Sequence, residues 1–148
     1  EIQSYIETEL IRMKEYGNEI SLIMIDIDNF KQVNDTYGHK EGDVVILALA
    51  NLLKSKQTVY EKRFSAGRWG GEEFMLLLYD AGISDAAHIA ELIRQCFENT
   101  VFANVKPQTV SIGVTQARID DTLDTLCIRV DSGLYKAKNS GKNCVVVI

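Results

Sequence analysis

The stretch LIMIDIDNFK, residues 22–31, decides the fold, because an uninterrupted apolar run changes there into acidic and polar residues. Leu22 to Ile25 are continuously apolar, which is typical of a central strand covered on both faces. We expect this strand to stop at Asp26. Ligand sites often lie at strand ends, so Asp26 is a candidate ligand-binding residue, with a helix cap as the alternative. Asp28 is placed to cap the helix that follows.

Outward from this stretch, hydrophobic periodicity predicts alternating helices and strands. An N-terminal helical segment, 1–16, has its apolar stripe over 2–13. The further predicted elements are a strand over 22–25, a helix over 44–53 introduced by Gly42 and Asp43, an antiparallel hairpin over 59–64 and 74–79, a helix from Ser84 or Asp85 to 99, a strand over 109–115, a helix over 122–138 and a strand over 145–148. This order favours an α+β or mixed α/β sheet with helices packed on it.

Length and composition exclude several classes of protein. The chain has 148 residues, which predicts one domain. Its net charge of −5 argues against a nucleic-acid polymer as partner. No apolar run reaches the roughly 20 residues of a membrane helix, so we expect a cytoplasmic domain without membrane contact. Because the chain begins at Glu1 without a methionine, we expect it to be a piece of a longer protein.

Two adjacent acidic residues, Glu72 and Glu73, follow the predicted turn at Gly70 and Gly71. If the strand of Asp26 lies beside this hairpin, its carboxylate and one glutamate converge as hard oxygen ligands for Mg²⁺. Neighbouring strand residues point to opposite faces, so the two glutamates are not expected to do the same job. A solvated acidic turn is the alternative.

A basic segment closes the last predicted helix, where Lys138 and Lys142 offer the attraction that a triphosphate needs. Compensation of the helix dipole is the alternative, and the segment is not a P-loop. Asn34 and Asp43 carry the amide and carboxylate that suit a guanine edge, although both types also occur as turn and cap residues. His39 between them is a weaker candidate.

Taken together, these motifs resemble the GGDEF family of diguanylate cyclases, here with a GGEEF variant of the signature. The resemblance covers residues 20–148. It implies an α+β fold with a central, mostly antiparallel five-stranded sheet surrounded by helices, similar to nucleotidyl cyclase and polymerase palm domains with a ferredoxin-like core. The motifs that carry it are DIDNFK at 26–31, NDTYGH at 34–39 with Gly-Asp at 42–43, RWGGEEF at 68–74, SIGV at 111–114 and AKNSGKN at 137–143.

The same resemblance implies an activity and partners. A diguanylate cyclase condenses two GTP into cyclic di-GMP and two pyrophosphates, at the interface of a homodimer, in bacterial second-messenger signalling. The implied cofactor is Mg²⁺, with Mn²⁺ as an alternative. Residues 1–148 then form a single cyclase domain, whose helix at 1–16 is truncated from a multidomain protein with an N-terminal sensory or regulatory domain. Any membrane anchor of that protein lies outside this domain.

The resemblance also assigns roles to individual residues. The implied metal ligands are Asp26, the main-chain carbonyl of Ile27 and Glu73, with Glu72 as general base or further metal ligand. The implied substrate contacts are Asn34 and Asp43 to guanine, His39 near the nucleotide, Asn29, Phe30 and Lys31 in a phosphate-binding turn, and Lys138 and Lys142 to the terminal phosphates. An acid at Asp43 argues for guanine over adenine.

Two positions depart from the family pattern. Lys142 replaces a commoner arginine, which keeps the charge but loses the bidentate fork, so we expect a weaker grip on phosphate. The Arg-x-x-Asp product-inhibition site of many members falls on Glu61 and Phe64, so inhibition through it should be absent. The alternative to a cyclase is a catalytically silent module that binds GTP or a partner protein.

Overall fold

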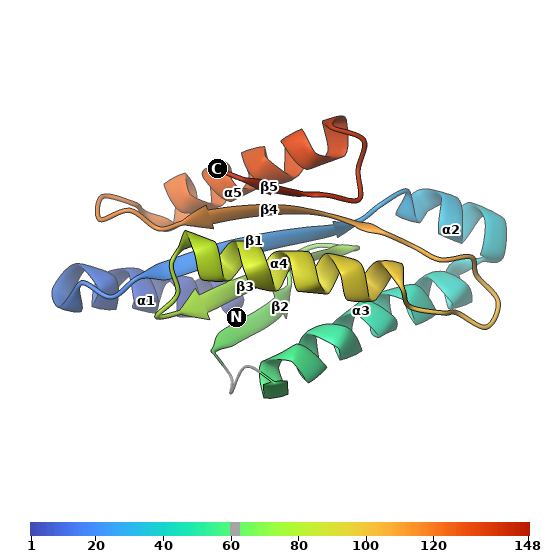
Figure 1. Ribbon diagram of the computed structural model, residues 1–148, viewed down its shortest axis with the longest axis horizontal. Helices are drawn as coiled ribbons and strands as arrows, with labels where there is room; N and C mark the ends of the chain where they lie inside the picture. The colour runs from blue at the N-terminus through green and yellow to red at the C-terminus, as the bar shows by residue number, and fades with distance from the viewer. Residues whose placement is uncertain (60–62) are drawn as a thin grey trace.

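A computed structural model describes residues 1–59 and 63–148 of the protein, which form one sheet flanked by helices (Figure 1). The strands are β1 (Ile20–Ile27), β2 (Phe64–Arg68), β3 (Glu73–Tyr79), β4 (Val110–Gln116) and β5 (Val145–Val147). The helices are α1 (Ile2–Tyr16), α2 (Phe30–Tyr37), α3 (His39–Val59), α4 (Ile83–Glu98) and α5 (Leu123–Asn139). None of these helices is both long enough and apolar enough to cross a membrane.

Strand β1 lies at the centre of the sheet, whose order in the described residues is β2-β3-β1-β4-β5. It pairs antiparallel with β3 and with β4, and only β5 runs parallel to its neighbour. All of β1 is buried, as expected for a continuous apolar strand covered on both faces. The predicted α+β class and the mostly antiparallel five-stranded sheet are confirmed.

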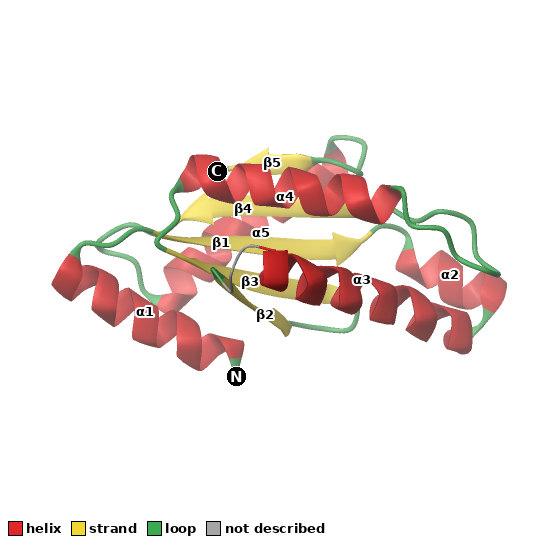
Figure 2. Ribbon diagram, turned by 60° about the horizontal axis from the view of Figure 1, so that its bottom comes forward, coloured by secondary structure: helices red, strands yellow, loops and turns green. Residues whose placement is uncertain are grey.

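Helices cover both faces of the sheet (Figure 2). Helices α3 and α4 cover one face, where the core includes Ile23 and Ile25 of β1. Helices α1 and α5 cover the other face, where Leu22 and Met24 are buried. Because side chains alternate along a strand, Asp26 continues the series of Leu22 and Met24 and points toward the α5 face.

Helix α5 is placed tightly against the sheet at Gly113 of β4. A Cβ atom at Gly113 would collide with backbone atoms of Val130 and Leu134 in α5. The start of the helix is fixed by a capping box, in which Thr122 and Thr125 each accept a hydrogen bond from the other's backbone N–H. The placement of α5 is therefore fixed by contacts that lie from about one turn to more than three turns before Lys138.

Two predicted boundaries near the candidate site were wrong, and the bounds of one helix were not predicted. Strand β1 does not stop at Asp26, because its pairing continues through Ile27. The helix predicted over 44–53 begins at His39, so Gly42 and Asp43 lie inside it. A separate helix, α2, precedes it and was anticipated only as the helix that Asp28 would cap.

Two further boundaries are shifted. The first hairpin strand is Phe64–Arg68 and not 59–64, because α3 continues to Val59; residues 60–62 lie outside the described residues. Helix α4 begins at Ile83, one residue before the predicted caps, and its N-cap is Gly82. The free N–H of Ile83 donates to the Gln116 side chain at 2.9 Å, which replaces a capping side chain within the helix.

Candidate active site

Asp26 stands at the centre of the candidate site. It is only 3% exposed and lies directly across the sheet from Glu73, its register partner on β3. Its Oδ2 contacts the ammonium group of Lys138, which α5 brings over the end of β1. Its Oδ1 is buried and has no hydrogen-bond partner among the described residues. A buried carboxylate oxygen without a donor is a position that a ligand or cation can occupy.

The pKa values of Asp26 and Lys138 both depart from their ordinary values. Burial raises the pKa of Asp26 to about 6 against the influence of Lys138, and the nearby carboxylates of Glu72 and Glu73 add to the rise. Burial also lowers the pKa of Lys138, but the same three carboxylates outweigh it and raise that pKa above its ordinary value. The site therefore holds an excess of negative charge that one lysine does not neutralise.

A hollow of about 220 Å³ opens beside Asp26 and collects most of the predicted site residues. Its lining combines the end of β1, the turn into α2, the β2–β3 hairpin and the end of α5. The lining residues are Asp26, Ile27, Asp28, Asn29, Phe30, Lys31, Glu72, Lys138 and Lys142. The structure thus brings together residues that lie more than a hundred positions apart in the chain.

The lysine contributed by the α5–β5 turn is held over this hollow. The ammonium group of Lys142 donates to the side-chain oxygen of Asn29 at 2.6 Å. Both residues have left-handed backbone conformations, with φ of 62° at Lys142 and 53° at Asn29. Such conformations are unfavourable for non-glycine residues and cluster at functional sites.

Glu72 and Glu73 diverge, as their adjacency predicted. Glu72 lines the hollow beside Asp26, whereas Glu73 lines a neighbouring one with Trp69 and Cys127. The turn that carries them is fixed by Arg68, whose Nε and Nη2 donate to the Gly71 carbonyl at 2.8 and 2.6 Å. The two glutamates therefore approach Asp26 from different sides.

The predicted guanine-reading residues do not line this hollow. Asn34 lies on α2 and Asp43 in α3, with the exposed His39 at the start of α3. Asn34 packs against Gly42, where any Cβ would collide with its Oδ1. This contact brings Asn34 next to the turn of α3 that carries Asp43. Helix α2 connects this corner to the hollow, since it begins with Phe30 and Lys31.

The donor set suits a hard divalent cation, although it is not assembled as a finished metal cage. Among the described residues, no group of three or more acidic, histidine or cysteine side chains is positioned to hold a metal ion. The unpartnered Oδ1 of Asp26 and the excess negative charge from Glu72 and Glu73 nevertheless match the oxygen ligands that Mg²⁺ prefers. Mg²⁺ usually takes only one or two carboxylates and completes its shell with water and substrate phosphates.

The predicted capping role of Asp28 is wrong. The N-cap of α2 is Asn29, which makes no side-chain cap bond, and Asp28 instead accepts hydrogen bonds from Thr109, Ser111 and Asn143. Local sequence reasoning missed these partners because they lie more than 80 residues away along the chain. The available signal was a pair of hydroxyl residues, Thr109 and Ser111, at the start of an otherwise apolar strand.

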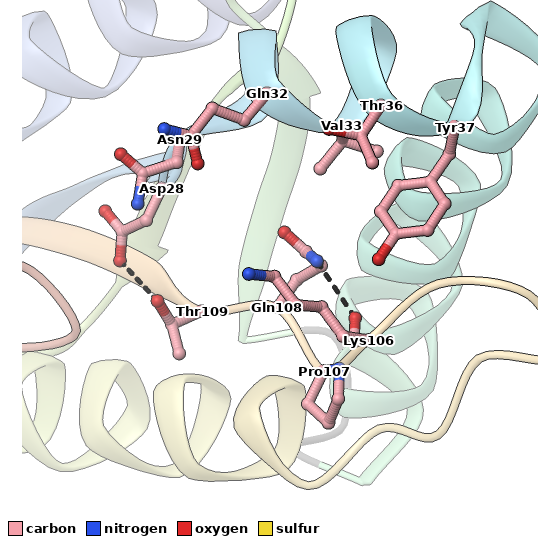
Figure 3. Close-up of a pocket in the computed structure, with 10 residues that line it drawn as sticks. All are labelled: Asp28, Asn29, Gln32, Val33, Thr36, Tyr37, Lys106, Pro107, Gln108 and Thr109. Carbon is pink, nitrogen blue, oxygen red and sulfur yellow. Dashed lines mark hydrogen bonds between the residues drawn. The ribbon is translucent and has the colours of Figure 1, made fainter.

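A second cavity of about 220 Å³ lies behind the turn at Asp28 and Asn29, between α2 and residues 106–109 (Figure 3). Val33 and Tyr37 of α2 form one wall, and Pro107 lies on the opposite side. The cavity shares Asp28 and Asn29 with the first hollow but includes neither Asp26 nor the two glutamates. Asp26, Glu72, Lys138 and Lys142 thus line the hollow beside Asp26 and not this second cavity.

The sequence and the fold of the chain are similar to those of known proteins. A family model described as "Diguanylate cyclase, GGDEF domain" matches residues 1–144. The chain is 43% identical over 130 residues to diguanylate cyclase DgcM of Escherichia coli, covering 88% of this chain and 31% of that protein. It is 40% identical over 136 residues to the response regulator PleD of Caulobacter vibrioides, covering 88% of this chain and 29% of that protein. The chain thus spans about a third of these relatives.

Solved structures show the same fold. The active GGEEF domain of a diguanylate cyclase from Vibrio cholerae aligns with a TM-score of 0.90 at 35% identity, covering 98% of this chain and 92% of that one. The coiled coil and GGDEF domain of DgcB from Caulobacter crescentus, in complex with c-di-GMP, aligns with a TM-score of 0.92 at 28% identity. That alignment covers 99% of this chain and 78% of the other.

Proposed function

Since the chain belongs to the GGDEF family of diguanylate cyclase domains, we propose that it condenses two GTP into cyclic di-GMP and two pyrophosphates. In each of the two bond-forming steps, a ribose 3′-hydroxyl of one GTP attacks the α-phosphorus of the other, and pyrophosphate leaves. The observation that carries the proposal is the hollow in which Asp26, Glu72 and two lysines meet. Carboxylates that can hold a metal ion, next to lysines that can hold phosphate, suit a metal-bound triphosphate.

The chain offers ligands for the cation that this reaction uses. Asp26, the main-chain carbonyl of Ile27 and Glu73 would hold Mg²⁺ or Mn²⁺, with Glu72 as a further ligand. When bound, the cation lowers the pKa of the attacking hydroxyl and neutralises charge on the phosphates. Lys138, which contacts Asp26 in the structure, would be free to hold substrate phosphates once that carboxylate had a cation as its partner.

The remaining roles belong to side chains of this protein. Glu72 accepts the proton of the 3′-hydroxyl, and Lys138 and Lys142 hold the phosphates that leave as pyrophosphate. The Asn29–Lys31 turn binds phosphate oxygens at the start of α2. Asn34 and Asp43 read the guanine edge, with His39 beside the nucleotide.

One domain binds one GTP, so two copies must face each other before either bond forms. We infer that turnover requires a homodimer and takes place in the cytoplasm, and that an N-terminal sensory or regulatory domain of the full-length protein controls it. We also infer that the GGEEF signature is active and that product inhibition through an Arg-x-x-Asp site is absent. Phe64 at the aspartate position is 1% exposed in β2, and Glu61 lies outside the described residues.

The test is incubation with Mg²⁺ and GTP over a series of protein concentrations, with chromatographic separation of nucleotides and a pyrophosphate assay. Cyclic di-GMP whose specific rate rises with protein concentration is expected. If GTP binds and no product forms even after fusion to a forced dimer, the proposal is wrong and a silent GTP-binding module replaces it.

A further inference from the structure

Asp28 is a second buried carboxylate at the end of β1, and the reaction above gives it no role. It is 5% exposed and accepts hydrogen bonds from Thr109 Oγ1 at 2.7 Å and Ser111 Oγ at 2.6 Å. The backbone N–H of Asn143 donates a third bond at 3.0 Å. Figure 3 shows the contact between Asp28 and Thr109. Both oxygens of Asp28 are thus occupied by donors, unlike those of Asp26.

The turn that Asp28 holds has an unfavourable backbone conformation. Lys142 and Asn143 are consecutive left-handed residues, with φ of 62° and 47°. A lysine keeps such an angle only where surrounding contacts impose it, whereas an asparagine adopts it more readily. The hydrogen bond from the N–H of Asn143 to Asp28 is a contact of this kind, and it acts directly on the strained backbone.

The same turn is held from its other side by α4. Arg94 Nη1 donates to the side-chain oxygen of Asn143 at 2.9 Å, and the side-chain amide of Asn143 donates to Glu98. The side chain of Asn143 is therefore fixed by α4 and its backbone by Asp28. Lys142, the residue before this doubly anchored asparagine, extends to Asn29 and lines the hollow.

We propose that Asp28 is a positioning residue for GTP, which acts by fixing the Lys142–Asn143 turn so that the Lys142 ammonium faces the terminal phosphates. This inference rests on the proposed function and adds to it a residue outside the implied ligand set. Asp28 contributes to substrate affinity through Lys142, whereas Asp26 acts on the reacting groups.

Two substitutions at Asp28 separate this role from a general loss of stability. Asp28→Ala leaves the N–H of Asn143 without its acceptor. Asp28→Asn keeps the shape, and its amide oxygen can still accept from Asn143, while the Ser111 hydroxyl rotates to accept from the new NH₂ group. The asparagine variant is thus expected to retain function that the alanine variant loses.

The first measurement is hydrogen exchange of the segment 140–144, which needs no nucleotide. Faster exchange of the Asn143 amide is expected in Asp28→Ala and not in Asp28→Asn. Unchanged exchange in the alanine variant overturns the proposal. Asp28→Ser, too short to reach Asn143, takes the place of the alanine variant if that protein does not fold.

The second measurement is the Kd for a non-hydrolysable GTP analogue with Mg²⁺, in a double-mutant cycle with Lys142→Ala. Asp28→Ala is expected to weaken binding about tenfold alone and less than twofold when Lys142 is already absent. An equal loss in both backgrounds overturns the proposal, because Asp28 then does not act through Lys142. If the unchanged protein binds no GTP, the proposed function fails, while the exchange experiment still decides the role of Asp28.

Discussion

Asp26 and Asp121 are both 3% exposed, and each faces a basic residue of α5, yet they differ in almost every other respect. Asp121 accepts from Arg129 Nη1 and Nη2 at 2.9 and 2.6 Å, from Thr125 Oγ1 at 2.9 Å and from the Arg118 N–H at 2.7 Å. Asp26 has only Lys138 at one oxygen and no partner at the other.

The pKa values of the two carboxyl groups follow their partners. Burial alone would raise the pKa of Asp121, but the hydrogen bonds from Arg129 and the Arg118 N–H lower it to about 2. Burial raises the pKa of Asp26 to about 6, because one lysine does not offset it. At the N-terminal end of α5, both oxygens of Asp121 accept hydrogen bonds, which stabilises the fold. At the C-terminal end, one oxygen of Asp26 has no donor and is available for a ligand.

The largest effect on stability is expected at Asp121, whose oxygens all have hydrogen-bond donors. Asp121→Asn leaves the nearly buried Arg129 without its counter-charge, which should lower the free energy of unfolding by about 3 kcal/mol. Urea denaturation measures this difference, and the exposed neighbour Asp120→Asn is the matched control, with an expected change within about 0.5 kcal/mol. Equal stability of the two variants would contradict a structural role for Asp121.

Gly113→Ala tests whether the two ends depend on the same placement of α5. The added Cβ collides with the backbone of Val130 and Leu134, so α5 must move away from β4. We expect a loss of about 2 kcal/mol in stability and a loss of cyclase activity in the folded protein, because Lys138 is carried by α5. Gly71→Ala, where a Cβ meets nothing within 4 Å, is the control for stability. Wild-type activity in Gly113→Ala would show that the site tolerates a displaced helix.

The two carboxyl groups should give opposite dependences of stability on pH. Between pH 6 and pH 4 the folded state takes up a proton at Asp26 that the unfolded state does not, so acidification through this window stabilises the fold. Below about pH 4 the unfolded state protonates at the Asp121 position first, so up to about 2 kcal/mol is lost as pH falls toward 2. Urea denaturation across pH 7 to 2 should show the first slope vanish in Asp26→Asn and the second become smaller in Asp121→Asn, where the lowered pKa of Glu91 still contributes. An unchanged slope in either variant contradicts the assignment.

The smallest effect is expected for Lys142→Arg, which gives the site beside Asp26 an arginine, the residue type that pairs with Asp121. Lys142→Arg supplies a planar fork that can bind phosphate with two parallel hydrogen bonds. We expect the KM for GTP to fall about threefold with kcat unchanged, as steady-state kinetics at a fixed protein concentration would show. An unchanged or higher KM would mean that Lys142 does not contact the terminal phosphates.

The sequence predicted the parts of this molecule that depend on local pattern. The apolar run ending at Asp26, the paired glutamates at 72–73 and the helix over 122–138 were each recognisable from periodicity and residue type. The convergence of Asp26 with a glutamate followed from placing β1 beside the hairpin, whereas Lys138 was assigned to phosphate and its contact with Asp26 was not predicted. Such features depend on a few neighbouring residues, or on a strand order that the rules for connecting strands restrict to a few possibilities.

What the sequence did not predict depends on distant partners. Asp28 was interpreted as a cap because its donors at Thr109, Ser111 and Asn143 are far along the chain. Asp121 and Arg129 were not singled out, because an acid and a base near a helix start are usually solvated. The strand starting at Phe64 was misplaced since the helix before it runs further than its apolar pattern indicates.

The most direct test of the difference between the two ends is a paired measurement on Asp26→Asn: its rate of cyclic di-GMP formation with Mg²⁺ and GTP, and its free energy of unfolding at pH 7. Loss of all measurable product is expected, with stability no lower than that of wild type, because the neutral amide avoids the burial of a charge and Lys138 can reach water. Wild-type product formation, or a loss of stability as large as that of Asp121→Asn, would contradict the assignment of Asp26 as a ligand-binding carboxylate.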